Sequence, residues 1–137
     1  MIATNDVITK EVVFNSKIDN VWNAISIGEE ISKWFLKADF KPEVGYKYSF
    51  RSPNDDCEQI HGEVKEATPY KLVYTWIVAG TNVETKVSWE LQSTDEGTQL
   101  YLKHSGIAEY DEDTAIKMFE SFNGGWDNCI SGLTDFL

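Results

Sequence analysis

The sequence predicts an α+β fold in which a curved antiparallel sheet of about six to seven strands wraps around one long C-terminal helix. Three observations predict this fold. The middle of the chain consists of short segments in which apolar and polar residues alternate, separated by turn sequences. The C-terminal stretch carries apolar residues at helical spacing. Two shorter helical patterns follow the first strand-like segment.

The first strand and the two short helices occupy the N-terminal part of the chain. Residues 7–14 have the strand pattern, and Ser16 is the expected N-cap of the helix that follows. The apolar residues of this helix are Val21, Trp22 and Ile25. Gly28 is expected to end it, and a second short helix is expected over residues 29–35.

The middle of the chain carries the pattern of an antiparallel sheet. Alternation places the apolar residues of each strand on one face, so we expect one covered face and one that meets water. The predicted strands are residues 46–51, 58–66, 71–78, 83–93 and 98–104. Between them lie sequences with the Gly, Pro, Asn or Asp that chain reversals need, at residues 41–45, 52–56, 68–69, 79–82 and 95–97.

Residues 71–78 differ from the other predicted strands because they are apolar on both faces. A central strand of the sheet would have this pattern, and so would a strand whose outer face meets a second copy of the chain. We favour the central strand, and the pattern leaves open whether the protein is a monomer or a homodimer.

The last predicted element is a helix of about 24 residues, which corresponds to roughly 35 Å. Asp113 or Thr114 is its expected N-cap. Its apolar positions form one broad stripe: Ala115, Met118, Phe119, Phe122, Trp126, Cys129, Ile130, Leu133 and Phe136. Gly124 and Gly125 lie in its middle, where each costs about 1 kcal/mol relative to Ala, so we expect a kink or a close approach of the helix to the sheet.

Length and charge restrict the classes of function. A chain of 137 residues is expected to form one domain, residues 1–137. Its formal net charge of −11 repels phosphate, so nucleic acid and anionic membrane surfaces are not expected partners. Solubility is the simplest explanation of the charge, and a basic protein partner is the alternative.

The sequence contains no recognisable cofactor, metal or catalytic motif. Cys57 and Cys129 are far apart and lack the neighbouring Cys and His of a zinc or redox site. The first six residues do not resemble a secretory signal, and no apolar stretch is long enough to span a bilayer. These features favour the cytoplasm, with two free thiols, no metal and no cofactor.

Five short motifs, in this order and spacing over residues 8–137, resemble a known group of proteins. They are Val21-Trp22-Asn23-Ala24-Ile25, Trp34-Phe35, Gly62-Glu63-Val64, His104-Ser105-Gly106 and Gly125-Trp126. The chain is similar to the START and birch-pollen-allergen-type superfamily (SRPBCC), whose fold is the helix-grip. Within it, the chain most resembles the family related to the C-terminal domain of the activator of the ninety-kilodalton heat-shock-protein ATPase. The superfamily includes lipid and hormone carriers, polyketide cyclases and oxygenase domains.

A helix-grip encloses a space between the sheet and the C-terminal helix. The strand residues expected to point into it are Tyr48, Phe50, Ile60, Tyr74, Trp76, Trp89, Leu100, Leu102 and His104. The helix residues expected to reach it are Trp34, Met118, Phe122 and Trp126. These residues predict the binding of a small hydrophobic or aromatic ligand, although side chains at such spacings also simply fill a core.

Two other functions remain as alternatives. His104 shares a strand face with Leu100 and Leu102, so a buried imidazole could act as a general base in a cyclase-like or hydrolase-like enzyme. A lone histidine on an apolar face is more often structural. The acidic surface favours a protein-interaction module, such as a co-chaperone, as the third interpretation. We assign no catalytic residue.

Overall fold

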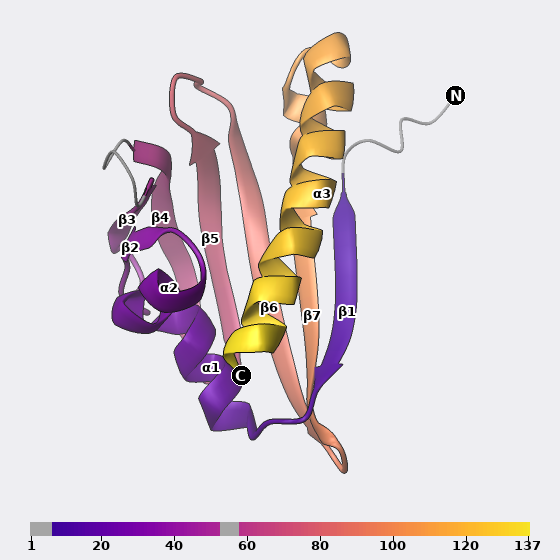
Figure 1. Cartoon of the computed structure of the whole chain (residues 1–137). Helices are drawn as coiled ribbons and strands as arrows, with labels where there is room; N and C mark the ends of the chain where they lie inside the picture. Colours follow the sequence, from indigo (N-terminus) through magenta and orange to yellow (C-terminus); the bar gives the residue numbers. More distant parts are fainter. Residues whose placement is uncertain (1–6, 53–57) are drawn as a thin grey trace.

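The computed structural model describes residues 7–52 and 58–137 (Figure 1). The N-terminal residues assessed for a secretory signal, most of the predicted turn at residues 52–56, and Cys57 lie outside this part of the chain. Within it, no helix is long and apolar enough to cross a membrane.

The chain folds into one antiparallel sheet and three α-helices, so the predicted helix-grip fold is confirmed. The strands are β1 (Ile8–Phe14), β2 (Lys37–Asp39), β3 (Lys47–Arg51), β4 (Glu58–Thr68), β5 (Lys71–Val78), β6 (Glu84–Thr94) and β7 (Gly97–Ser105). The helices are α1 (Ile18–Ser26), α2 (Gly28–Trp34), the 3-10 turn η1 (Ile107–Glu109) and α3 (Glu112–Phe136). The predicted strands agree with these bounds within two residues, and the short strand β2 was not predicted.

The sheet has the order β1-β7-β6-β5-β4-β3-β2, and every neighbouring pair is antiparallel. Strands β2 to β7 are neighbours in the order of the sequence, whereas the chain crosses from β1 to the opposite edge through α1 and α2. Strand β5 therefore lies in the middle of the sheet, which confirms the interpretation of residues 71–78 as a central strand.

All three α-helices lie on the same face of the sheet (Figure 1). Helix α3 crosses in front of β6 and β7, and α1 and α2 lie beside it toward the β2 edge. The predicted alternation is confirmed on β7, where Leu100, Leu102 and His104 are buried and Tyr101 and Lys103 are exposed. Burial of these inward faces against the helices is the main force that holds the layers together.

The helix N-caps differ from the prediction. Lys17 rather than Ser16 occupies the N-cap of α1, and its side chain caps no backbone N–H. Asp111 rather than Asp113 or Thr114 caps α3, because its carboxylate accepts a hydrogen bond from the Thr114 backbone N–H at 3.0 Å. This bond satisfies one of the unpaired donors at the start of the helix.

The glycines of α3 also differ from the expectation. The helix runs without interruption, and a Cβ at Gly124 or Gly125 would meet nothing within 4 Å. The expected close approach at this pair is therefore wrong. It occurs instead at Gly132, where a Cβ would lie 3.2 Å from the carbonyl oxygen of Trp34.

Strand β4 has an irregularity that the alternation pattern could not reveal. Its register with β5 shifts between Val64 and Glu66, so Glu66 pairs with Val73 on the outer face although it has the sequence parity of the inner residues. A Cβ at Gly62 would lie 2.2 Å from the carbonyl oxygen of Thr75. Glycine is needed here because β5 approaches too closely for a side chain.

Candidate ligand-binding groove

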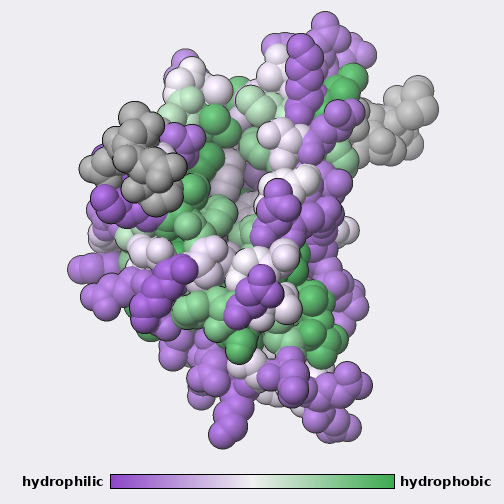
Figure 2. All heavy atoms as spheres, viewed as in Figure 1, coloured by the Kyte–Doolittle hydropathy of each residue, from purple (hydrophilic) through white to green (hydrophobic). Residues whose placement is uncertain are grey.

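A groove of about 670 Å³ lies between α3 and the strands β4 and β5. Figure 2 shows hydrophobic residues gathered in a hollow beside α3, on the side away from β1. The residues that line the groove are Phe35, Leu36, Ser52, Gln59, Ile60, Trp76, Val78, Met118, Ser121, Phe122, Gly125 and Trp126. Its volume falls within the range of pockets that hold small molecules.

Three parts of the fold build the groove. Ile60 on β4 and Trp76 on β5 face inward because they occupy the apolar positions of their strands. The segment that follows α2 contributes two apolar residues on a second side. Helix α3 forms the third side with residues spaced at i, i+3, i+4, i+7 and i+8, which place them on one face: Met118, Ser121, Phe122, Gly125 and Trp126.

The described lining is mainly apolar and carries no charge. None of the described residues that line the groove is Asp, Glu, Lys, Arg or His. The polar residues of the lining are Ser52, Gln59 and Ser121. Such a surface favours an apolar ligand, because none of the described lining residues could pair with a charge buried there.

Five of the thirteen residues predicted to contact a ligand line this groove: Ile60, Trp76, Met118, Phe122 and Trp126. The other eight lie elsewhere in the packed interior: Trp34, Tyr48, Phe50, Tyr74, Trp89, Leu100, Leu102 and His104. Aromatic rings fill much of this interior, where Phe50 packs against Tyr48 and Tyr74 at centroid distances of 4.9 and 6.5 Å. Contact with a ligand stays a prediction for all thirteen residues.

Sequence reasoning did not assign seven of the lining residues: Phe35, Leu36, Ser52, Gln59, Val78, Ser121 and Gly125. Phe35 belongs to the expected second helix, but α2 ends at Trp34, so helical spacing does not give the direction of Phe35. Leu36 lies beyond the helix and has no periodic pattern. The sequence did single out Gly125, because a glycine inside a helix destabilises it relative to alanine and therefore indicates a special environment. Open space in front of its Cα belongs to the groove.

His104 is fully buried, and both nitrogens of its ring have partners. The Trp126 indole donates to Nδ1 at 3.0 Å, and Nε2 lies 2.7 Å from the Thr85 hydroxyl. An indole N–H only donates, so Nδ1 accepts and the ring proton is assigned to Nε2, which donates to Thr85. The Thr85 hydroxyl in turn donates to the Trp76 carbonyl oxygen at 2.9 Å.

This arrangement keeps His104 neutral. Burial lowers its pKa from the ordinary value of 6.5 to about 3. Because both nitrogens are occupied by internal partners, neither is open to a substrate in the groove. The geometry therefore favours a structural His104 over the general base that the strand pattern allowed.

Trp76 differs from other tryptophans that pack in the interior. The Trp89 indole donates to the Tyr74 hydroxyl at 2.9 Å, and the Trp34 indole donates to the Ala24 carbonyl oxygen at 2.8 Å. Within residues 7–52 and 58–137, the buried Nε1 of Trp76 has no hydrogen-bond partner. Trp76 is 6% exposed and lines the groove.

Other possible reactive groups among the described residues do not form a site. Burial raises the pKa of the Cys129 thiol to about 12, which keeps it protonated and weakly nucleophilic. In the described part of the chain, no three His, Cys, Asp or Glu side chains are grouped to hold a metal ion.

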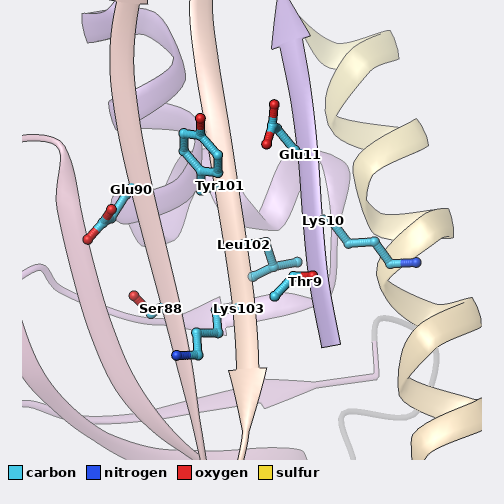
Figure 3. A pocket seen from close by; sticks show the side chains of 8 residues that line it. All are labelled: Thr9, Lys10, Glu11, Ser88, Glu90, Tyr101, Leu102 and Lys103. Atoms are coloured by element: carbon cyan, nitrogen blue, oxygen red, sulfur yellow. The ribbon is translucent and has the colours of Figure 1, made fainter. Parts of the chain in front are cut away.

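A second hollow, of about 400 Å³, lies on the outer face of the sheet over β1, β6 and β7 (Figure 3). Glu11, Glu90, Tyr101 and Lys103 surround it, and Lys10 points away from it toward α3. Its rim is charged, and Tyr101 is 40% exposed. Leu102 is the one aliphatic residue among the described residues that line it, so it lacks the apolar lining of the first groove.

Comparison with solved structures finds the same fold in bacterial proteins. Protein MLL2253 from Mesorhizobium loti is 24% identical with a TM-score of 0.83, and the match covers 95% of each chain. BH1534 from Bacillus halodurans is 28% identical with a TM-score of 0.76, again over 95% of each chain. CalU16 from Micromonospora echinospora is 20% identical with a TM-score of 0.73, over 95% of this chain and 73% of that one. No curated protein sequence matches the chain.

The sequence itself also matches a family model. The model is described as "Activator of Hsp90 ATPase homolog 1-like protein", and it matches residues 15–137, from the end of β1 to the C-terminus. This range includes every residue that lines the groove. The chain therefore belongs to the family of Activator of Hsp90 ATPase homolog 1-like proteins, as its sequence motifs and helix-grip fold predict.

Proposed function

We propose that the protein binds a small hydrophobic or aromatic molecule in the groove between α3, β4 and β5. The observation that carries this proposal is the groove itself. It is an apolar space of about 670 Å³ next to an interior that aromatic side chains otherwise fill. A folded chain covers apolar surface where it can, so an open apolar groove of this size is a candidate binding site.

The expected driving force is burial of apolar surface. An aromatic ring system that loses about 150–200 Å² of exposed area gains about 4–5 kcal/mol at roughly 25 cal/mol per Å². Edge contacts with Trp76, Phe122 and Trp126 add to this energy. The loss of motional freedom on binding offsets part of this energy, so we expect a dissociation constant in the high-micromolar to millimolar range for a ligand of this size.

A structural neighbour gives indirect support. DynU16 is described as a putative protein in the dynemicin biosynthetic locus and has a TM-score of 0.80 at 20% identity. The match covers 96% of this chain and 46% of that one. A place in a biosynthetic locus is consistent with a small-molecule ligand for this fold.

Two glycine variants test the proposal. N-phenyl-1-naphthylamine, an uncharged apolar dye, should bind the wild-type protein saturably and fluoresce more strongly when bound. Gly125→Leu places a side chain in the groove and should weaken dye binding by at least about tenfold, since roughly 1.4 kcal/mol of contact is lost.

Gly124→Leu is the matched control. This neighbouring glycine is also exposed in the same helix, and a Cβ there meets nothing within 4 Å, but it does not line the groove. The control should bind the dye like the wild type. The proposal fails if the wild type shows no saturable binding, or if both leucine variants bind equally well.

A further inference from the structure

The chemical class of the ligand follows from one unpaired group in the groove. Nε1 of Trp76 is a buried donor without an acceptor among the described residues, and the ring that carries it lines the groove. A buried donor without a partner is disfavoured, because the group loses its bond to water and gains nothing in exchange. Three other indoles of this chain avoid that cost by donating to an internal acceptor: Trp34, Trp89 and Trp126.

The packing around Trp76 does not provide a substitute acceptor. Its closest aromatic contacts are Trp126 at 5.1 Å and His104 at 5.5 Å between ring centroids. Both nitrogens of His104 are already engaged, by Trp126 and Thr85. The carbonyl oxygen of Trp76 accepts from Thr85, whereas its indole Nε1 has no partner among the described residues.

The charge of the groove defines a second property of the ligand. Its described lining contains no ionisable side chain, and the chain as a whole has a net charge of −11. A carboxylate or phosphate ligand would lose its hydration without finding a cation and would enter against the field of the protein. An ammonium ligand would likewise find no carboxylate among the described residues that line the groove.

We infer that the groove takes an uncharged apolar molecule that carries a hydrogen-bond acceptor, such as a ketone or ether oxygen, and that this oxygen accepts from Nε1 of Trp76. This inference rests on the proposed function and adds the chemical class of the ligand. Nε1 has almost no accessible surface, so binding requires a neighbouring side chain to turn aside. Phe122 is placed for this role, because it is half-buried, lines the groove and packs edge-on against Trp76 at 6.3 Å.

Three probes that share one ring system test separately whether the ligand needs a hydrogen-bond acceptor and whether it must be uncharged. Naphthalene has no acceptor, 2-acetylnaphthalene adds a neutral ketone, and 2-naphthoate adds a charged carboxylate. The wild-type protein should bind 2-acetylnaphthalene about fivefold or more tightly than naphthalene, which is the range of a net hydrogen bond. It should bind 2-naphthoate at least about tenfold more weakly than 2-acetylnaphthalene.

The variant Trp76→Phe removes the donor and keeps an aromatic ring. It should bind the two neutral probes within about twofold of each other. Trp22→Phe is the control, because Trp22 packs against Tyr70 outside the groove, and it should keep the wild-type preference. In nitrogen–proton NMR spectra, the indole signal that Trp76→Phe removes should move downfield with 2-acetylnaphthalene and should not do so with naphthalene.

The outcomes distinguish the two proposals. If naphthalene binds but the ketone brings no gain, the inferred ligand class is wrong and the groove remains a binding site. The same holds if Trp76→Phe keeps the preference, or if 2-naphthoate binds as tightly as the ketone. If none of the probes binds the wild type, the proposed function fails and the inferred ligand class fails with it.

Discussion

His104 illustrates at the scale of one residue how a polar side chain is made compatible with an apolar core. Its imidazole stacks on Phe122 with a centroid distance of 4.7 Å, while hydrogen bonds to Thr85 and Trp126 satisfy both nitrogens. Through Trp126 the ring joins β7 to α3. The hydrogen bonds fix one tautomer and one orientation of the ring, which favours a single packing of the core.

The buried neutral state of His104 predicts a pH-dependent stability. Its folded pKa of about 3 lies below the unfolded value of 6.5, so between these values the unfolded chain binds a proton that the folded chain does not. The contribution of His104 to the free energy of unfolding is fully present above pH 6.5 and is lost as the pH falls. From pH 7 to pH 5 the free energy of unfolding should drop by about 2 kcal/mol because of this residue.

Urea unfolding at the two pH values measures this drop, and His104→Gln isolates it. Glutamine keeps an acceptor and a donor but does not titrate, so the variant should lose about 2 kcal/mol less than the wild type between pH 7 and pH 5. Equal losses in the two proteins would show that His104 is not buried in its neutral form.

Sequence patterns predicted whether a side chain points into the protein better than whether it lines the groove or fills the core. Alternation along β3, β5, β6 and β7 correctly placed the aromatic and aliphatic residues inside. It could not separate groove from core, because that depends on where α3 and the segment after α2 leave space. Trp76 and Tyr74 lie on the same strand face, yet Trp76 lines the groove and Tyr74 does not.

At the scale of elements, helix α3 combines residues with three different tasks. Trp126, Cys129 and Leu133 are buried against the sheet, and Gly125 leaves space for the groove. On another side of the helix, Lys10 of β1 contacts Asn123 at 2.7 Å and Asp127 at 2.8 Å. These contacts lie on either side of the glycine pair and tie the helix to the edge strand at the point where its backbone is least restrained.

The glycines of α3 should respond oppositely to the same substitution. Gly124→Ala should raise the free energy of unfolding by about 1 kcal/mol, because alanine is the better helix former and the new methyl group meets nothing within 4 Å. Gly132→Ala should bring no such gain and should lower stability, since its Cβ would lie 3.2 Å from the carbonyl oxygen of Trp34.

Chemical denaturation of the two alanine variants beside the wild type makes this comparison. A common gain in both variants would mean that α2 and α3 move apart easily at Trp34. A loss at Gly124 would mean that the helix needs flexibility there.

The elements themselves were largely predictable, and the failures have physical causes. The long helix and the main strands have strong periodic patterns, because burial of one face repeats along them. Strand β2 has three residues, too few for a pattern. The N-cap of α3 was placed two or three residues late, because several acidic and hydroxyl residues precede the helix and each could cap it. The β4 irregularity depends on a backbone contact between strands that no local pattern contains.

The excess of acidic residues acts on the whole molecule. The chain has 23 acidic and 12 basic residues, and none of the described residues that line the groove is charged. Repulsion among like charges favours expansion of the chain, and dissolved ions screen it with a Debye length of about 10 Å at 0.1 M salt.

Salt should therefore stabilise the folded protein. Raising sodium chloride from about 10 mM to about 500 mM should increase the melting temperature by roughly 3–5 °C. Binding of an uncharged ligand should change little over the same range, because the described residues that line the groove carry no ionisable side chain. Thermal melts and dye titrations at both salt concentrations check the two parts, and a fall of the melting temperature would show that attractive ion pairs dominate.

The position of β1 in the sheet affects how the chain folds during its synthesis. Ile8 pairs with His104, which the ribosome adds 96 residues later. At about 5–20 residues per second, this separation corresponds to roughly 5–20 s of translation. During that time β1, the first strand to emerge, has no partner strand while β2 to β6 can already pair with their neighbours. We therefore expect a nascent chain stalled before β7 to expose β1 to proteases and to chaperones that bind extended segments, and release of the complete β7 to end that exposure.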